Sequence, residues 1–104
     1  MQVTLNPDSP QCASLALSGD LDLAAVDTVR TAVTSALRDA ACTGISLDLA
    51  EVTFIDSTGL GTLVAIRNLC RERNITLVLR RPSPAARRLL QLSTLDTVFT
   101  LTDS

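Results

Sequence analysis

Two short segments of this 104-residue chain place acidic and hydroxyl side chains beside glycine. One is Gly-Asp-Leu-Asp over 19–22, and the other is Ile-Asp-Ser-Thr-Gly-Leu-Gly over 55–61. Side chains of these types can cap a helix, hold a cation or accept a phosphoryl group. Ser57 lies where a helix should start, and there the free backbone N–H groups and the helix dipole favour an anion. The residue types therefore make Ser57 a candidate phosphorylation site.

Other uses of these residues stay open. Asp56, Ser57 and Thr58 are all preferred cap residues, whatever the protein does. The glycines of the segment 59–61 lack the third glycine of a dinucleotide fingerprint and the lysine of a P-loop. Nucleotide binding is therefore weakly supported, and plain helix capping is the main alternative to phosphorylation.

The composition excludes several kinds of site. The chain has no His and no Lys, so the commonest general base, the commonest metal ligand and Schiff-base chemistry are missing. Asp20 and Asp22 lack a third acidic partner, so a turn residue and a cap are favoured over a metal pair. A net charge of −2 and only two aromatic residues argue against nucleic-acid binding. We therefore expect no enzymatic activity, no cofactor, no metal and no direct nucleic-acid partner.

Cysteine usage and hydropathy indicate the compartment. Cys12, Cys42 and Cys70 are odd in number and contain no CxxC pair, which predicts three buried, reduced thiols. The N-terminal segment lacks a signal-peptide pattern, and no run of about 18 apolar residues occurs. We expect a cytoplasmic protein with no membrane partner.

Hydrophobic periodicity predicts the elements that position these residues. Alternating or continuous apolar residues predict strands over 2–5, 13–18, 45–55, 75–79 and 98–101. Apolar residues spaced by three and four predict helices over 23–37, 57–73 and 84–92. Asp22 is the expected cap of the first helix, and Ser83 followed by Pro84 opens the third. A turn cluster over 6–10 suits a hairpin between the first two strands.

This alternation of strands and helices predicts an α/β fold. The sheet should be small, mixed and mostly parallel, with right-handed crossovers, about three helices and an antiparallel N-terminal strand at one edge. The length predicts a single domain over 1–104. Function in such sheets gathers at the carboxyl ends of the parallel strands, where both acidic loops fall.

The helix after Ser57 has apolar residues on more than one side. One set can face the sheet: Leu63, Ile66 and Cys70. A second set aligns on another stripe: Leu60, Val64, Arg67 and Arg71. A mixed apolar and arginine stripe beside a modifiable serine is typical of a protein-binding surface. Burial of Leu60 and Val64 beneath the third helix is the alternative.

These segments resemble one family. The loop 19–22 with its following helix, the segment 47–61, and the turn 80–84 with the helix after it look like the STAS domain of bacterial anti-sigma factor antagonists. The similarity covers nearly the whole chain, and 54–61 is its most specific part. It implies the STAS fold.

The resemblance also implies a function in transcription regulation by partner switching. An unphosphorylated antagonist binds an anti-sigma factor that is also a serine kinase, and this frees the sigma factor. Phosphorylation of the antagonist ends the complex, and a protein phosphatase resets it. A structural STAS module in a stress-signalling assembly or a lipid-transport complex is the alternative.

Individual positions carry over from the family. Ser57 matches the phosphorylated serine, Asp56 the acidic residue before it, and Asp22 the acidic residue of the preceding loop. Thr58 matches a second, weaker acceptor. With the stripe described above, the predicted partner-binding residues are Asp22, Asp56, Ser57, Thr58, Gly59, Leu60, Val64 and Arg67.

Overall fold

The structure, a computed structural model, describes residues 1–6 and 13–103. Its strands are β1 (Gln2–Asn6), β2 (Ala13–Leu21), β3 (Gly44–Ile55), β4 (Thr76–Arg80) and β5 (Thr100–Thr102). Its α-helices are α1 (Val26–Leu37), α2 (Ser57–Glu72) and α3 (Pro84–Leu92). Two short 3-10 helices precede α1 and β5, namely η1 (Leu23–Ala25) and η2 (Leu95–Thr97). Most of the predicted hairpin turn over 6–10 lies outside the described residues.

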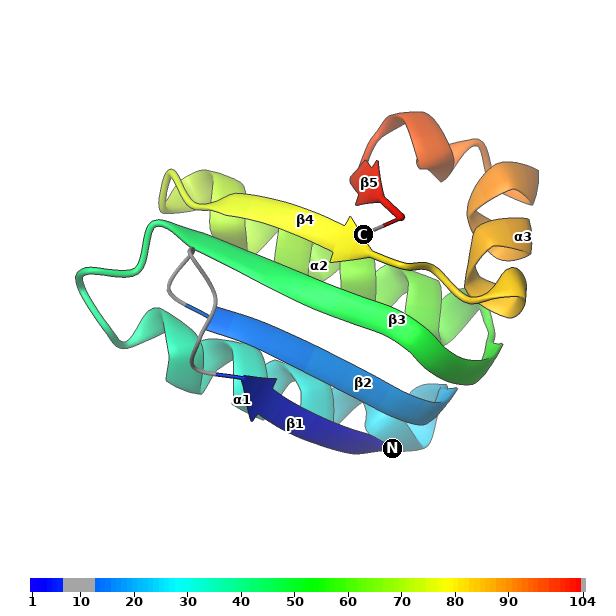
Figure 1. Cartoon of the computed structure of the whole chain (residues 1–104), viewed down its shortest axis with the longest axis horizontal. Helices are drawn as coiled ribbons and strands as arrows, with labels where there is room; N and C mark the ends of the chain where they lie inside the picture. The colour runs from blue at the N-terminus through cyan, green and yellow to red at the C-terminus, as the bar shows by residue number, and fades with distance from the viewer. Residues whose placement is uncertain (7–12, 104) are drawn as a thin grey trace.

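The elements combine into the predicted mixed sheet. The five strands lie in the order β1-β2-β3-β4-β5, with β1 antiparallel to β2 and the other neighbours parallel. Figure 1 shows α1 behind β1 and β2, α2 behind β3 and β4, and α3 beyond the carboxyl end of β3. One face of the sheet therefore carries both long helices, and the carboxyl ends of β2 and β3 meet the start of α2.

Three predicted boundaries need correction by more than one residue. The second strand continues to Leu21 instead of ending at 18. The first helix begins with η1 rather than as an α-helix at 23, and α1 proper starts at Val26. The last strand spans 100–102 instead of 98–101, because η2 occupies 95–97 and turns the chain first. The predicted opening of α3 is confirmed, since the Ser83 hydroxyl accepts a hydrogen bond from the Ala86 amide at 3.2 Å.

Two bulges in β3 keep its apolar side chains directed at the helices. The register between β2 and β3 shifts after Ala16 and again after Gly19, each time by one additional residue of β3. Each additional residue reverses the inside–outside alternation of a strand. The buried apolar side chains of β3 are accordingly spaced by two residues at first and then by three: Ile45, Leu47, Leu49, Val52 and Ile55.

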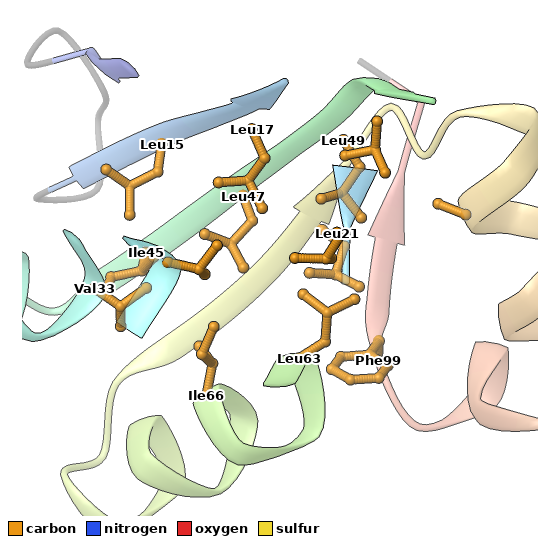
Figure 2. Close-up of a cluster of buried hydrophobic side chains, with 14 of the residues drawn as sticks. Leu15, Leu17, Leu21, Val33, Ile45, Leu47, Leu49, Leu63, Ile66 and Phe99 are labelled. Atoms are coloured by element: carbon orange, nitrogen blue, oxygen red, sulfur yellow. The ribbon is translucent and has the colours of Figure 1, made fainter. Parts of the chain in front are cut away.

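The core lies between the sheet and the two long helices. Figure 2 shows Leu15 and Leu47 from the sheet facing the helices, with Ile66 of α2 and Val33 of α1 directed toward them. All four side chains are buried. Their burial removes apolar surface from water and fixes α1 and α2 on the same face of the sheet.

The cysteines differ from the expectation at one position. Cys70 is free and buried, as predicted, and burial raises the pKa of its thiol. Cys42 is also buried, but it is disulfide-bonded, so the prediction of a reduced thiol is wrong for this residue. Spacing along the chain does not determine which sulfur atoms approach each other in space. Cys12 lies outside the described residues.

A buried carboxylate ties β3 to the turn before α3. Asp48 accepts a hydrogen bond from Arg81 Nε at 3.1 Å and another from the Ala50 amide at 3.0 Å, and it pairs with the Arg81 guanidinium. Burial by itself raises the pKa of Asp48, but the hydrogen bonds from Arg81 and Ala50 and the nearby arginine charges outweigh it. The pKa of Asp48 therefore lies below its ordinary value of 3.8.

This shift predicts an acid-sensitive contribution to stability. A carboxyl group whose pKa is lower in the folded state stabilises the fold above its unfolded pKa, and the contribution is lost as the pH falls through the folded pKa. We expect Asp48→Asn to lower the free energy of unfolding at pH 7 by about 1 to 2 kcal/mol. The difference between the two chains should stay constant as the pH falls from 7 to about the ordinary value of 3.8 and should shrink below it. Denaturant titration across this range measures it, and a pH-independent difference would contradict the assignment.

Candidate functional site

The start of α2 is capped by Asp56, not by Ser57. Asp56 Oδ1 accepts a hydrogen bond from the Gly59 amide at 2.9 Å. Ser57 is the first residue of α2, and the side chains of Ser57 and Thr58 are exposed. Neither hydroxyl forms a hydrogen bond with another residue in the described part of the chain. The capping hypothesis is thus confirmed for Asp56, and the Ser57 hydroxyl is not used by the helix.

Gly59 lets the first turn of α2 lie directly on the end of β2. A Cβ atom at position 59 would be 2.0 Å from the Leu21 carbonyl oxygen, far inside van der Waals contact. The Asp56 amide donates to the same oxygen at 3.5 Å. Because Asp22 follows Leu21 and Ser57 follows Asp56, this contact brings the two predicted acidic loops together.

Asp22 is not used as a helix cap. It stands before η1 with extended backbone and makes no side-chain capping hydrogen bond, so the expected capping role is wrong. Within residues 1–6 and 13–103 its half-buried carboxylate has no hydrogen-bond or ion-pair partner. The reason is that η1 intervenes, so the first turn of α1 lies three residues farther along. An acidic group near Ser57 thus remains available for another role.

Asp20 has a structural partner at the same end of the sheet. Its Oδ1 accepts a hydrogen bond from Thr53 Oγ1 at 3.3 Å, which joins the ends of β2 and β3. The described residues contain no cluster of three or more acidic, cysteine or histidine side chains that could hold a metal ion. The Asp20 carboxylate therefore has a structural role, because its hydrogen bond links the ends of the two strands.

The remaining predicted partner-binding residues divide into two groups. Gly59 and Leu60 are buried, so they support the site from beneath rather than face a partner. Val64 and Arg67 are half-buried, and α3 packs mainly on β3 and η2 rather than on α2. Coverage by the third helix therefore does not account for the partial burial of Val64. Arg67 lies ten residues beyond Ser57, about 15 Å along the helix axis, so the structure does not bring these two residues together.

Two large apolar side chains at this end of the sheet are exposed, which the sequence does not predict. Leu23 is 74% exposed directly after Asp22, and Phe54 is 49% exposed two residues before Asp56. Leu23 lies three residues before Val26, and Phe54 lies two residues after Val52, so both continue a regular apolar spacing that predicts burial. Large exposed apolar residues next to the loops that carry Asp22 and Ser57 are typical of a protein-binding surface.

Gly61 also differs from its neighbouring glycine. A Cβ atom at position 61 would meet nothing within 4 Å. Gly61 is exposed and lies one helical turn after Ser57, hence on the same side of α2. The fold does not require a glycine here, in contrast to Gly59. Asp22, Leu23, Phe54, Ser57 and Gly61 are called the serine surface below.

Comparison with known proteins places this arrangement in a family. A family model described as "Mlab, STAS domain" matches residues 6–102. The chain belongs to the STAS domain family. The anti-sigma F factor antagonist of Paenibacillus polymyxa is 31% identical to this STAS domain over 88 residues, which are 85% of this chain and 75% of the relative.

Solved structures share the fold of this STAS domain. An anti-sigma factor antagonist from Mycobacterium paratuberculosis is 27% identical, with a TM-score of 0.79 over 99% of this chain and 86% of that one. The antagonist SpoIIAA in its unphosphorylated form is 23% identical, with a TM-score of 0.74 over 99% and 89% of the two chains. Phosphorylated SpoIIAA from Bacillus is 24% identical, with a TM-score of 0.75 over 99% and 92%. The predicted STAS fold is confirmed. Among the described residues, no helix is long and apolar enough to cross a membrane.

Proposed function

We propose that this STAS domain is an anti-sigma factor antagonist that works by partner switching and is inactivated by phosphorylation of Ser57. The proposal rests on the exposed position of Ser57. Ser57 is exposed on the first turn of α2, the loop of Asp22 approaches this turn through Leu21, and the Ser57 hydroxyl is not needed by the fold. The related proteins from Paenibacillus polymyxa and Mycobacterium paratuberculosis are anti-sigma factor antagonists, and SpoIIAA occurs in phosphorylated and unphosphorylated forms.

The partner is an anti-sigma factor that is also a serine kinase. In the unphosphorylated state the serine surface docks on it, with Leu23 and Phe54 as apolar contacts and Val64 and Arg67 extending the contact along α2. Binding frees the sigma factor. A protein phosphatase reverses the modification, and the domain has a regulatory role without catalysis of its own.

Phosphorylation dissociates the complex by adding negative charge to the interface. A phosphate adds about −1.5 to −2 charge at pH 7, and Asp22 and Asp56 are already acidic neighbours. The free amides and dipole of the helix N-terminus tolerate this charge in the unbound protein. In a packed interface the same charge must be desolvated. A loss of roughly 3 to 4 kcal/mol weakens binding by two to three powers of ten, which is sufficient for a switch.

Asp22 is proposed to support phosphoryl transfer or partner binding. We expect Asp22→Asn to leave the midpoint of thermal unfolding nearly unchanged, because the carboxylate makes no capping hydrogen bond. The same change should slow phosphorylation of Ser57, or weaken kinase binding, by about tenfold, equivalent to roughly 1.4 kcal/mol. Kinase assays and titration calorimetry on both chains measure this. Unchanged phosphorylation rate and unchanged affinity together would remove Asp22 from the site.

The function is tested by reconstitution. A preformed complex of sigma factor and anti-sigma factor kinase is titrated with the STAS domain, and release of the sigma factor is followed by size-exclusion chromatography. Release is expected with the unmodified domain and not after incubation with ATP. Failure to displace any sigma factor, with stable co-purification of a lipid-transport ATPase instead, would favour the structural-module alternative.

A further inference from the structure

Among the residues that the structure describes, no strand pairs with the outer edge of β1. The sheet order places β1 at an edge, with β2 as its neighbour on the other side. Natural proteins blunt such edges with charged residues, proline or bulges, because unpaired backbone groups can pair with another chain. The β1 sequence Gln-Val-Thr-Leu-Asn contains no charge and no proline. Its pairing with β2 is continuous over all five residues, without a bulge.

The sequence of β1 is chemically symmetric about Thr4. An amide side chain stands at each end, Gln2 and Asn6, and an aliphatic side chain flanks Thr4 on each side, Val3 and Leu5. Side chains alternate between the faces of a strand, so the two aliphatic residues share one face and the three polar residues share the other. An antiparallel strand of the same sequence would therefore place like opposite like.

The aliphatic face of β1 borders an apolar groove against α1. Val3 and Leu5 line it together with Ala32, Ser35 and Ala36, and Leu5 is 58% exposed. The α1 side chains at the groove are all small, which leaves room beside β1 for side chains of a further strand. The outer edge of β1 and the half-open apolar groove beside it can therefore accept one more strand whose side chains match those of β1.

We propose that two copies of this chain pair through β1, antiparallel about a two-fold axis at Thr4. A two-fold interface is isologous, so residue i of one copy faces residue j of the other and the reverse. Val3 then faces Leu5 of the second copy in the groove, and Gln2 faces Asn6 of the second copy on the opposite face. Thr4 faces its own counterpart, a cross-strand pair that is favourable in antiparallel sheets. The absence of charge on β1 removes the like-charge repulsion that a self-pairing edge would otherwise have.

The pairing is independent of the proposed function. It joins two five-stranded sheets into one and leaves α2 uncovered, because α1 lies behind β1 and β2 whereas α2 lies behind β3 and β4 (Figure 1). Each copy would present its own serine surface. The dimer would therefore be a bivalent form of the domain, whatever that surface binds.

Because the proposed two-fold axis passes through Thr4, substitutions of Thr4 test the pairing. The association of the full chain is measured by analytical ultracentrifugation. The unchanged protein should move with concentration from the 11.0 kDa of one chain toward twice that mass. Thr4→Glu and Thr4→Arg each place like charges opposite each other at the axis, and each should weaken association at least tenfold. An equimolar mixture of the two variants should regain the dimer, because opposite charges then meet. Thr76→Glu makes the same change on an exposed residue of β4 and should dimerise as the unchanged chain does.

Two results would overturn the proposal. One is that the unchanged protein shows the mass of a single chain at every concentration up to about 1 mM. A dissociation constant of that size corresponds to an association free energy of only about 4 kcal/mol. The other is a folded Thr4→Glu chain that dimerises as strongly as the unchanged one. Circular dichroism of each variant establishes folding, which is expected because Thr4 is exposed in the single chain.

Discussion

Ser57→Asp is expected to weaken binding to the anti-sigma factor kinase by two to three powers of ten, whereas Ser57→Ala should bind nearly as tightly as the unchanged chain. The aspartate places a permanent negative charge where the interface must be desolvated, at a cost of roughly 3 to 4 kcal/mol. The alanine removes only a hydroxyl that makes no hydrogen bond with the described residues. Titration calorimetry of each variant against the purified kinase measures the difference.

Ser57→Asn is the matched control for this pair. Asparagine has nearly the shape of aspartate and no charge, so it should bind like Ser57→Ala if charge is the cause and like Ser57→Asp if size is the cause. Helix capping predicts the opposite ranking of alanine and aspartate, since aspartate is favourable at a helix N-terminus. Asp56 already provides the cap, so thermal stability should differ little among the three variants. A folded Ser57→Asp chain with undiminished affinity would refute the charge mechanism.

Gly59→Ala and Gly61→Ala are expected to change stability in opposite directions, although they are the same substitution two residues apart. The new Cβ at 59 would lie 2.0 Å from the Leu21 carbonyl oxygen, a backbone atom that cannot move without displacing β2. Relieving such an overlap should cost about 3 kcal/mol or prevent folding. The new Cβ at 61 meets open space, so replacement of a helical glycine should stabilise the chain by about 0.5 to 1 kcal/mol.

Urea denaturation of the two alanine variants measures these changes. A drop in the denaturation midpoint for Gly59→Ala beside a rise for Gly61→Ala would support the close approach of α2 to β2. Similar small changes in both would mean that the first turn of α2 does not rest on Leu21, and the juxtaposition of Asp22 with Ser57 would lose its basis.

The sequence predicted the elements well where periodicity is local. Helix α2 and strand β3 follow from runs of apolar residues whose spacing is set within one element. The bulges of β3 were not predicted, because they depend on pairing with β2, which is far away along the chain. Short 3-10 helices were not predicted either: η1 stands where the first α-helical turn was expected, and the amides of Val98 and Phe99 donate to the Leu95 carbonyl of η2 instead of joining the sheet. The state of Cys42 likewise depends on approach in space rather than on spacing.

The candidate site was predicted in its residue types and not in its three-dimensional arrangement. Ser57 and Asp22 followed from their loops and from the family resemblance, as did Asp56 with its capping role left as an alternative. The overlap at Gly59 is invisible in sequence, since a glycine beside a helix start has many possible reasons. Exposure of Leu23 and Phe54 was likewise hidden, because an apolar residue in an apolar chain is expected to be buried.

The central claim is that phosphorylation of Ser57 turns partner binding off. The most direct measurement is to incubate the chain with the anti-sigma factor kinase and ATP, map the modified residue by mass spectrometry, and determine the affinity of that same sample for the kinase. We expect phosphate on Ser57 and a hundredfold or greater loss of affinity. Phosphate mainly on Ser83 or Ser93, or a Ser57-phosphorylated chain that binds as tightly as the unmodified one, would contradict it.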